Sequence, residues 1–111
     1  MNIVIKATNL VLSAANKTYA KDKVGNLEKY INAIEAKIEL ERDRKHHSGL
    51  VFRAEVTLII GGKLIRAEAN AEELNAAIDL VIPKVKEQIS KFKEKKDTLQ
   101  KRGARSAKSK V

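Results

Sequence analysis

The sequence contains no cysteine and no tryptophan, and only one proline, two tyrosines and two phenylalanines among its 111 residues. Without cysteine the chain forms no disulfide and offers no thiolate, a usage that fits a reducing cytoplasm. No run of about 18 apolar residues is present, so no membrane-spanning helix is predicted. The opening MNIVIK is too short and too charged for a secretory signal. These features predict a single cytoplasmic domain with one modest core and no membrane partner.

Motifs for catalysis are also missing. There is no glycine loop between a strand and a helix to hold phosphate and no nucleophile elbow. The only histidines, His46 and His47, are adjacent, and adjacent residues chelate one ion poorly without further ligands. The acidic residues lie on predicted solvated faces, where none is placed as a general acid or base. The sequence therefore predicts a protein that is not an enzyme and that has no cofactor and no metal site.

Positive charge is concentrated at one end of the chain. The formal net charge is +9, and residues 91–111 hold nine of the 23 basic residues but only two of the 14 acidic ones. The preceding part of the chain is nearly neutral. Segment 97–111 has no apolar period and is predicted to be a disordered basic tail that follows a folded domain over 1–96. A basic end of this kind seeks phosphate, which favours a nucleic-acid partner over a solvated tail.

Four segments alternate apolar and polar residues with the two-residue period of half-buried strands. They cover residues 2–6, 33–41, 50–60 and 63–69, and Gly61-Gly62 between the last two is a hairpin signal. The pattern places Ile34 and Leu50 among the side chains that face the core. The outward side chains carry mixed charges, which indicates plain exposure to solvent.

The segment 72–96 has the clearest helical pattern. Its apolar stripe recurs at steps of three and four residues and comprises Leu74, Ala77, Ile78, Val81, Val85, Ile89 and Phe92. At about 100° per residue, one flank of the stripe carries Lys84, Lys91 and Lys95, and the other carries Lys86 and Lys93. Pro83 lies inside this helix, removes one backbone hydrogen bond and predicts a kink.

Another helix is predicted from the N-cap Ser13 to about Ile31. One face carries Asn16, Ala20, Val24, Leu27 and Ile31. The adjoining stripe carries Tyr19, Lys23, Asn26 and Tyr30. The two tyrosines are interpreted first as packing groups with hydrated hydroxyls and second as surfaces on which bases stack.

The predicted order is therefore β-α-β-β-β-α in a single α+β domain. The first two strands are expected to be parallel neighbours joined by a helical crossover, and the last three an antiparallel meander. Both helices have one apolar stripe and should pack on the same face of a four-stranded mixed sheet. This arrangement is like that of a double-stranded-RNA-binding domain.

Several motifs, in order and spacing, resemble the ribosome hibernation-promoting factor and protein Y family over about residues 2–96. They are LEKY at 27–30, the GG-x-x-x-RAEA hairpin at 61–69, and AAID at 76–79 followed by Lys84, Gln88 and Lys91. The chain departs from the family's usual pattern at Asn26, Asn75 and Pro83. It also resembles the short members, which lack a second domain.

The resemblance implies a factor that binds the small ribosomal subunit and its rRNA in the cleft for mRNA and the A- and P-site tRNAs. It would compete with mRNA and tRNA and keep ribosomes idle in stationary phase or stress. Short members either cooperate with a ribosome modulation factor to form ribosome dimers or hold single ribosomes idle, and the free protein is expected to be monomeric. Carried over by position, the implied RNA contacts are Lys23, Lys29, Arg66, Lys84, Lys86, Lys91, Lys93 and Lys95.

Two other interpretations stay open at this stage. A double-stranded-RNA-binding module has a similar fold, but it reads the minor groove partly with the start of its final helix. Here that helix begins beside Glu72-Glu73, which would repel phosphate. A protein-interaction module, in which the lysines only contact solvent, would bind a protein partner without dependence on salt.

Overall fold

The computed structural model describes residues 1–43 and 49–109, with side chains described as far as Glu94 in the last helix. The elements along the chain are β1 (Asn2–Thr8), α1 (Ala14–Gly25), the 3-10 helix η1 (Asn26–Lys29), β2 (Glu35–Arg42), β3 (Phe52–Ile60), β4 (Lys63–Ala71) and α2 (Leu74–Ser109). This order confirms the predicted α+β arrangement. His46 and His47 lie outside the described residues, and the described residues contain no cluster of side chains suited to a metal ion.

The four strands form one mixed sheet in the order β1-β2-β3-β4. β1 and β2 are parallel, and the β2–β3 and β3–β4 pairs are antiparallel, as the connections predicted. Gly61 and Gly62 both have positive φ angles, 41° and 87°, at the turn between β3 and β4. Glycine adopts such angles without a steric penalty, so these two residues allow the tight hairpin.

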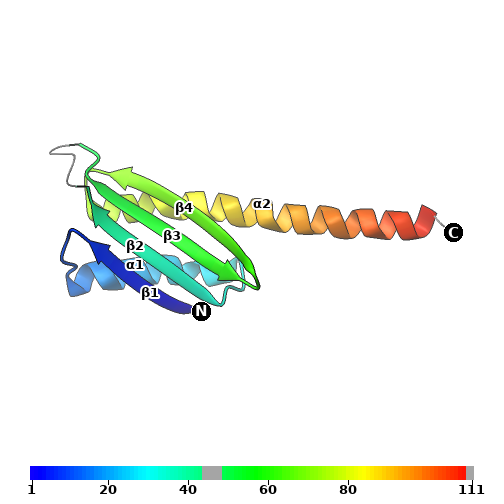
Figure 1. Cartoon of the computed structure of the whole chain (residues 1–111), viewed down its shortest axis with the longest axis horizontal. Helices are drawn as coiled ribbons and strands as arrows, with labels where there is room; N and C mark the ends of the chain where they lie inside the picture. The colour runs from blue at the N-terminus through cyan, green and yellow to red at the C-terminus, as the bar shows by residue number, and fades with distance from the viewer. Residues whose placement is uncertain (44–48, 110–111) are drawn as a thin grey trace.

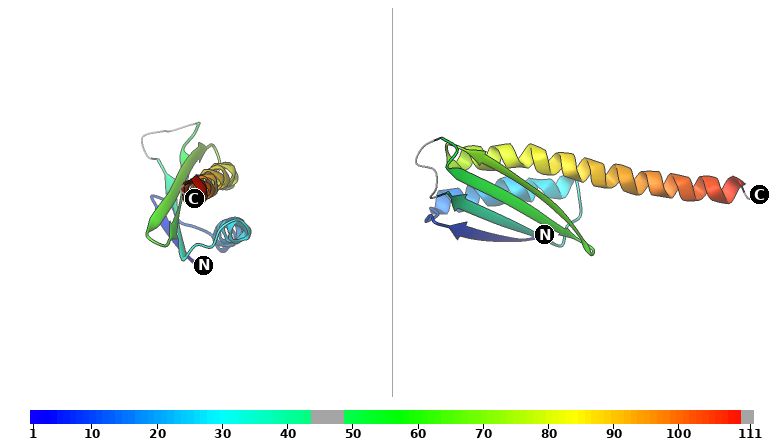
Figure 2. Two further views of the ribbon diagram at one scale, coloured as in Figure 1. Left: turned by 90° about the vertical axis from the view of Figure 1, so that its right-hand side faces the viewer. Right: turned by 45° about the horizontal axis from the view of Figure 1, so that its top comes forward.

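Both helices lie on the same face of the sheet, side by side (Figures 1 and 2). The core between the two layers contains the predicted stripe of α2, in which Ala77, Ile78, Val81, Val85 and Ile89 are buried. On the sheet side, β2, β3 and β4 contribute the buried residues Ala36, Ile38, Leu40, Ala54, Val56, Leu58, Ile65 and Ala69, and β1 contributes the partly buried Ile3 and Ile5. The apolar stripe of the helix and the inward side chains of the strands therefore pack together in one continuous core.

Two side chains predicted to face the core are instead exposed. Ile34 is 67% exposed and Leu50 is 59% exposed, while their neighbours Ala33 and Val51 are buried. Both exposed residues lie in bends just before β2 and β3 begin. The alternation of inward and outward side chains along a strand does not extend across a bend. Just before each strand, the buried residue is therefore displaced by one position from the one that the alternation predicts.

The first helix is shorter than predicted. It begins at the expected cap, where the Ser13 hydroxyl accepts a hydrogen bond from the Asn16 backbone N–H at 3.1 Å, but it ends at Gly25. The chain then tightens into η1, which buries Leu27, and Ile31 just after it is also buried. Asn16 takes part in the cap and does not join the core, because its side-chain oxygen accepts a hydrogen bond from the Ser13 N–H.

α2 continues through Pro83 as one element and projects beyond the sheet (Figure 1). Pro83 was predicted to kink this helix, and the helix continues past it without interruption. The sequence pattern ends the helix near residue 96, whereas the structure continues it to Ser109. The disorder of residues 97–111 in the free protein stays a prediction. No helix in the described part of the chain combines the length and the apolar character needed to cross a membrane.

The outer face of the sheet, which no helix covers, has a central ion-pair cluster. Arg53 lies among four carboxylates: its guanidinium contacts Glu39, and lies 3.2 Å from Glu41, 3.3 Å from Glu55 and 3.1 Å from Glu68. Partial burial lowers the pKa of Arg53, but its bonds to these carboxylates outweigh that effect and raise it above its ordinary value. The mixed charge expected on this face is thus organised around one arginine.

We expect Arg53→Met to destabilise the domain by about 1–3 kcal/mol, because four neighbouring carboxylates would lose their shared cation and repel one another. The loss stays moderate because the carboxylates are partly exposed to solvent. Chemical unfolding measures this change, and added salt should restore part of it by screening the repulsion. Lys37→Met is the matched control, since Lys37 lies on the same face and is exposed. Equal stabilities of the two variants, or a loss that salt does not change, would contradict this view of the cluster.

Candidate nucleic-acid interface

The predicted lysines of the two helices meet at a hollow of about 250 Å³ on the helical face. We call it the helix hollow. It is lined by Lys23 from α1, by Asn26, Leu27 and Lys29 from η1, by Tyr30, and by Ile82 and Lys86 from α2. Three of the sequence-predicted contacts, Lys23, Lys29 and Lys86, therefore belong to one site although they come from segments far apart in the chain.

The helix hollow is positively charged. No carboxylate is among the described residues that line it. Glu28, the acid nearest to Lys29 in sequence, instead pairs with the Met1 amino group at 3.0 Å. The Lys86 ammonium lies 5.1 Å from the centre of the Tyr30 ring, a cation–π contact that leaves its charge available to a ligand. An anionic group entering here meets three cations and no competing acid.

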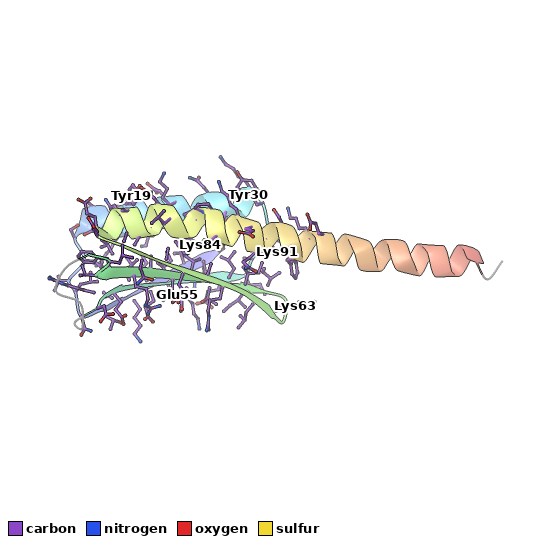
Figure 3. All side chains as sticks on the ribbon, turned by 90° about the horizontal axis from the view of Figure 1, so that it is seen from above. Tyr19, Tyr30, Glu55, Lys63, Lys84 and Lys91 are labelled. Carbon is purple, nitrogen blue, oxygen red and sulfur yellow. The ribbon has the colours of Figure 1, made fainter. Side chains whose placement is uncertain are left out.

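Lysines on the other flank of α2 already have partners within the protein. The Lys84 ammonium donates a hydrogen bond to the Glu68 backbone carbonyl at 3.2 Å, at the edge of β4. Lys91 pairs with Glu87, one turn earlier, at 3.3 Å. Both side chains are exposed (Figure 3). They can reach a ligand, but each would have to give up an existing contact, so the two flanks of α2 are not equivalent.

The remaining predicted contacts are not in the helix hollow. Lys93 is exposed and follows Lys86 by about two turns on the same flank of α2. Arg66 extends from β4 on the outer sheet face, where it lines a separate hollow of about 430 Å³ with Lys37 and Leu64. The side chain of Lys95 is outside the described residues. Arg66 thus lines a different hollow from Lys23, Lys29 and Lys86.

Two polar contacts outside the helix hollow join α1 to α2. The Tyr19 hydroxyl of α1 donates a hydrogen bond to the Asp79 carboxylate of α2. One turn away, the Asn16 side-chain amide donates to the Asn75 side-chain oxygen at 3.3 Å. Asn75, one of the departures from the family pattern, therefore has a partner on the facing helix. These bonds join residues about 60 positions apart, which no local sequence pattern predicts.

The bond between Tyr19 and Asp79 has a pH-dependent consequence. The hydrogen bond to Asp79 raises the pKa of Tyr19, and the nearby negative charge acts in the same direction. A raised pKa in the folded state means that this stabilisation is complete below the ordinary tyrosine pKa of 10.0 and is lost as the pH rises above it.

We therefore expect the stability difference between the wild type and Tyr19→Phe to shrink as the pH is raised through the alkaline range. Thermal unfolding of both proteins at matched pH values measures it. The two proteins differ only in this hydroxyl, so the difference in stability isolates its contribution. A difference that stays constant with pH would show that the hydroxyl does not bond to Asp79.

Together the fold and the helix hollow define a small α+β binding domain with a cationic helical face. The chain belongs to the Sigma 54 modulation protein / S30EA ribosomal protein family, whose model matches residues 3–97. The family predicted from the motifs is therefore confirmed.

Individual relatives agree with this assignment. The chain is 29% identical over 97 residues to a ribosome hibernation promotion factor of Picosynechococcus, covering 86% of this chain and 50% of the relative. It is 32% identical over 89 residues to the factor of the same name from Staphylococcus aureus, covering 80% of this chain and 46% of the relative. The chain thus spans about half the length of these curated relatives. Both relatives are named for the promotion of ribosome hibernation.

Solved structures with the same fold include the N-terminal domain of Thermus thermophilus protein Y. Its TM-score is 0.68 at 29% identity, with 83% of this chain and 99% of that chain covered. A ribosomal subunit interface protein from Coxiella burnetii gives a TM-score of 0.72 at 20% identity, covering 85% of this chain and 99% of that chain, and supports the fold alone.

Proposed function

We propose that this protein is a ribosome hibernation factor that binds rRNA of the small ribosomal subunit with its helical face. The observation that carries the proposal is the convergence of Lys23, Lys29 and Lys86 on one hollow without a lining acid. Phosphate contacts dominate the affinity of most nucleic-acid-binding proteins, and lysine ammoniums supply them. The names of the two hibernation promotion factors support the ribosome as the partner.

Inhibition by this protein would be steric. With the helical face on rRNA phosphates in the cleft for mRNA and the A- and P-site tRNAs, the domain would exclude those ligands while it stays bound. The helix hollow provides the strongest contacts, and Lys84, Lys91 and Lys93 extend the cationic surface along α2. Arg66, on the other face, would contact rRNA only if the cleft also encloses the sheet. No bond is made or broken, and the protein would act in the cytoplasm.

Sedimentation of the purified protein with empty ribosomes on a sucrose gradient tests this proposal. We expect the protein to co-sediment with the small subunit, and we expect initiator tRNA with mRNA to reduce that association. The same gradient shows whether ribosomes sediment singly or as dimers, and adding a ribosome modulation factor tests cooperation. Failure to co-sediment at moderate salt, or association that tRNA and mRNA leave unchanged, would contradict binding in the decoding cleft.

A further inference from the structure

The two tyrosines of the chain differ in a way that indicates a specific role for one of them. The Tyr19 hydroxyl is bonded to Asp79, and the Lys23 ammonium lies 5.5 Å from the centre of its ring. Tyr19 is thus a packing group between the helices. Tyr30 is 42% exposed and lines the helix hollow. Its hydroxyl has no hydrogen-bond partner among the described residues.

The surroundings of Tyr30 suit a nucleotide better than a bare phosphate. The helix hollow combines an exposed aromatic ring, the apolar side chains of Leu27 and Ile82, and the amide of Asn26 with the three ammonium groups. Aromatic rings stack on unpaired bases, and amides form hydrogen bonds with base edges. A phosphate would need only the cations. Contacts to the RNA backbone alone would not require an exposed aromatic ring among the cations.

We propose that the helix hollow takes one unpaired nucleotide of an RNA chain. Its base stacks on Tyr30, and its phosphates contact Lys23, Lys29 and Lys86. Asn26 lies in reach of the base edge. The Lys86 ammonium, now over the Tyr30 ring, moves to the phosphate when the base enters, so one lysine couples the two parts of the site. This inference rests on the proposed function, which makes RNA the ligand. It adds that the bound nucleotide is unpaired and lies outside an RNA helix.

Tyrosine fluorescence in the free protein tests this site without ribosomes. The chain has two tyrosines and no tryptophan, so in a Tyr19→Phe variant all tyrosine emission comes from Tyr30. We expect a short oligouridylate at low salt to quench Tyr30 emission by stacking. The control is an abasic oligonucleotide of the same length, which carries the same phosphates without bases. Binding of both is followed separately by the anisotropy of a label on the oligonucleotide.

The proposal predicts quenching by the oligouridylate and much weaker quenching by the abasic oligonucleotide when both are bound. Equal quenching by the two, or binding of oligouridylate without quenching, would overturn it. Absence of oligouridylate binding at low salt would count equally against it. None of these outcomes depends on the ribosome, so they are separate from failure of the proposed function.

A pair of variants extends the test to the ribosome. Tyr30→Leu keeps an apolar side chain but removes the aromatic ring, and we expect it to weaken small-subunit binding roughly tenfold, the effect typical of losing one stacked base. Tyr30→Phe keeps the ring and should bind like the wild type. Because no charge changes, the dependence of affinity on salt should be the same in all three proteins. Equal affinity of Tyr30→Leu and Tyr30→Phe would refute the stacked base, and wild-type binding would still support the proposed function.

Discussion

Replacing Lys29 and Lys86 together by glutamine is expected to weaken binding to the small ribosomal subunit by roughly 100-fold or more. Each charge-assisted contact to phosphate is worth about 1.5–3 kcal/mol, which corresponds to at least about tenfold in affinity. The two lysines line the helix hollow from different elements, one from η1 and the other from α2. The slope of log affinity against log salt should fall by about two, one for each lost contact.

In the matched control, Lys6 and Lys37 are both replaced by glutamine, which removes the same charge from the outer sheet face. If the helical face carries the binding, this control should lose little affinity and keep its salt slope. A third pair, Lys84 and Lys91, should show an intermediate loss, because both lysines are exposed but already bonded to Glu68 and Glu87. Equal losses in all three pairs would mean that binding follows net charge and not the hollow.

Leu58→Ala is expected to have the largest effect on stability, about 2–5 kcal/mol. Leu58 is fully buried in the C-terminal part of β3, between the sheet and the helices, and its truncation leaves a cavity that rigid neighbours fill only in part. For a domain of this size, each kcal/mol lowers the melting temperature by about 4–8 °C. Differential scanning calorimetry at one protein concentration measures the change.

Leu64→Ala provides the matched control, because Leu64 is the same residue type on the adjacent strand β4 but is 62% exposed. We expect a change within about 0.5 kcal/mol there. A similar melting temperature for both variants would contradict the assignment of the core to the helical side of the sheet. Because Leu58 does not line the helix hollow and carries no charge, any folded fraction of Leu58→Ala should bind ribosomes with unchanged salt dependence.

Features with a regular period were predictable from the sequence alone. The stripe of α2 from Ala77 to Ile89 is buried as its spacing indicates, because a helix repeats its faces regardless of what lies around it. The hairpin at Gly61-Gly62 and the pairing of β1 with β2 likewise follow from local turn chemistry and from the crossover rule. The lysines flanking that stripe were identified on the same basis.

Other features depend on contacts between distant segments and were not predictable. The sequence places Tyr19 and Tyr30 on one stripe, yet Asp79 bonds only to Tyr19, and Tyr30 is left in the hollow. That difference arises from the packing of α1 and η1 against α2. Arg53 is similar, because the strand register gathers carboxylates from three strands around it. Local propensity contains no information about either arrangement.

A structure of the protein bound to the small ribosomal subunit, obtained by electron cryomicroscopy, tests the central claim most directly. We predict density for the domain in the cleft for mRNA and tRNA, with α1, η1 and α2 against rRNA and with Lys29 and Lys86 near phosphates. Density outside that cleft, or a domain in the cleft with the outer face of the sheet against rRNA and the helix hollow open to solvent, would contradict the account.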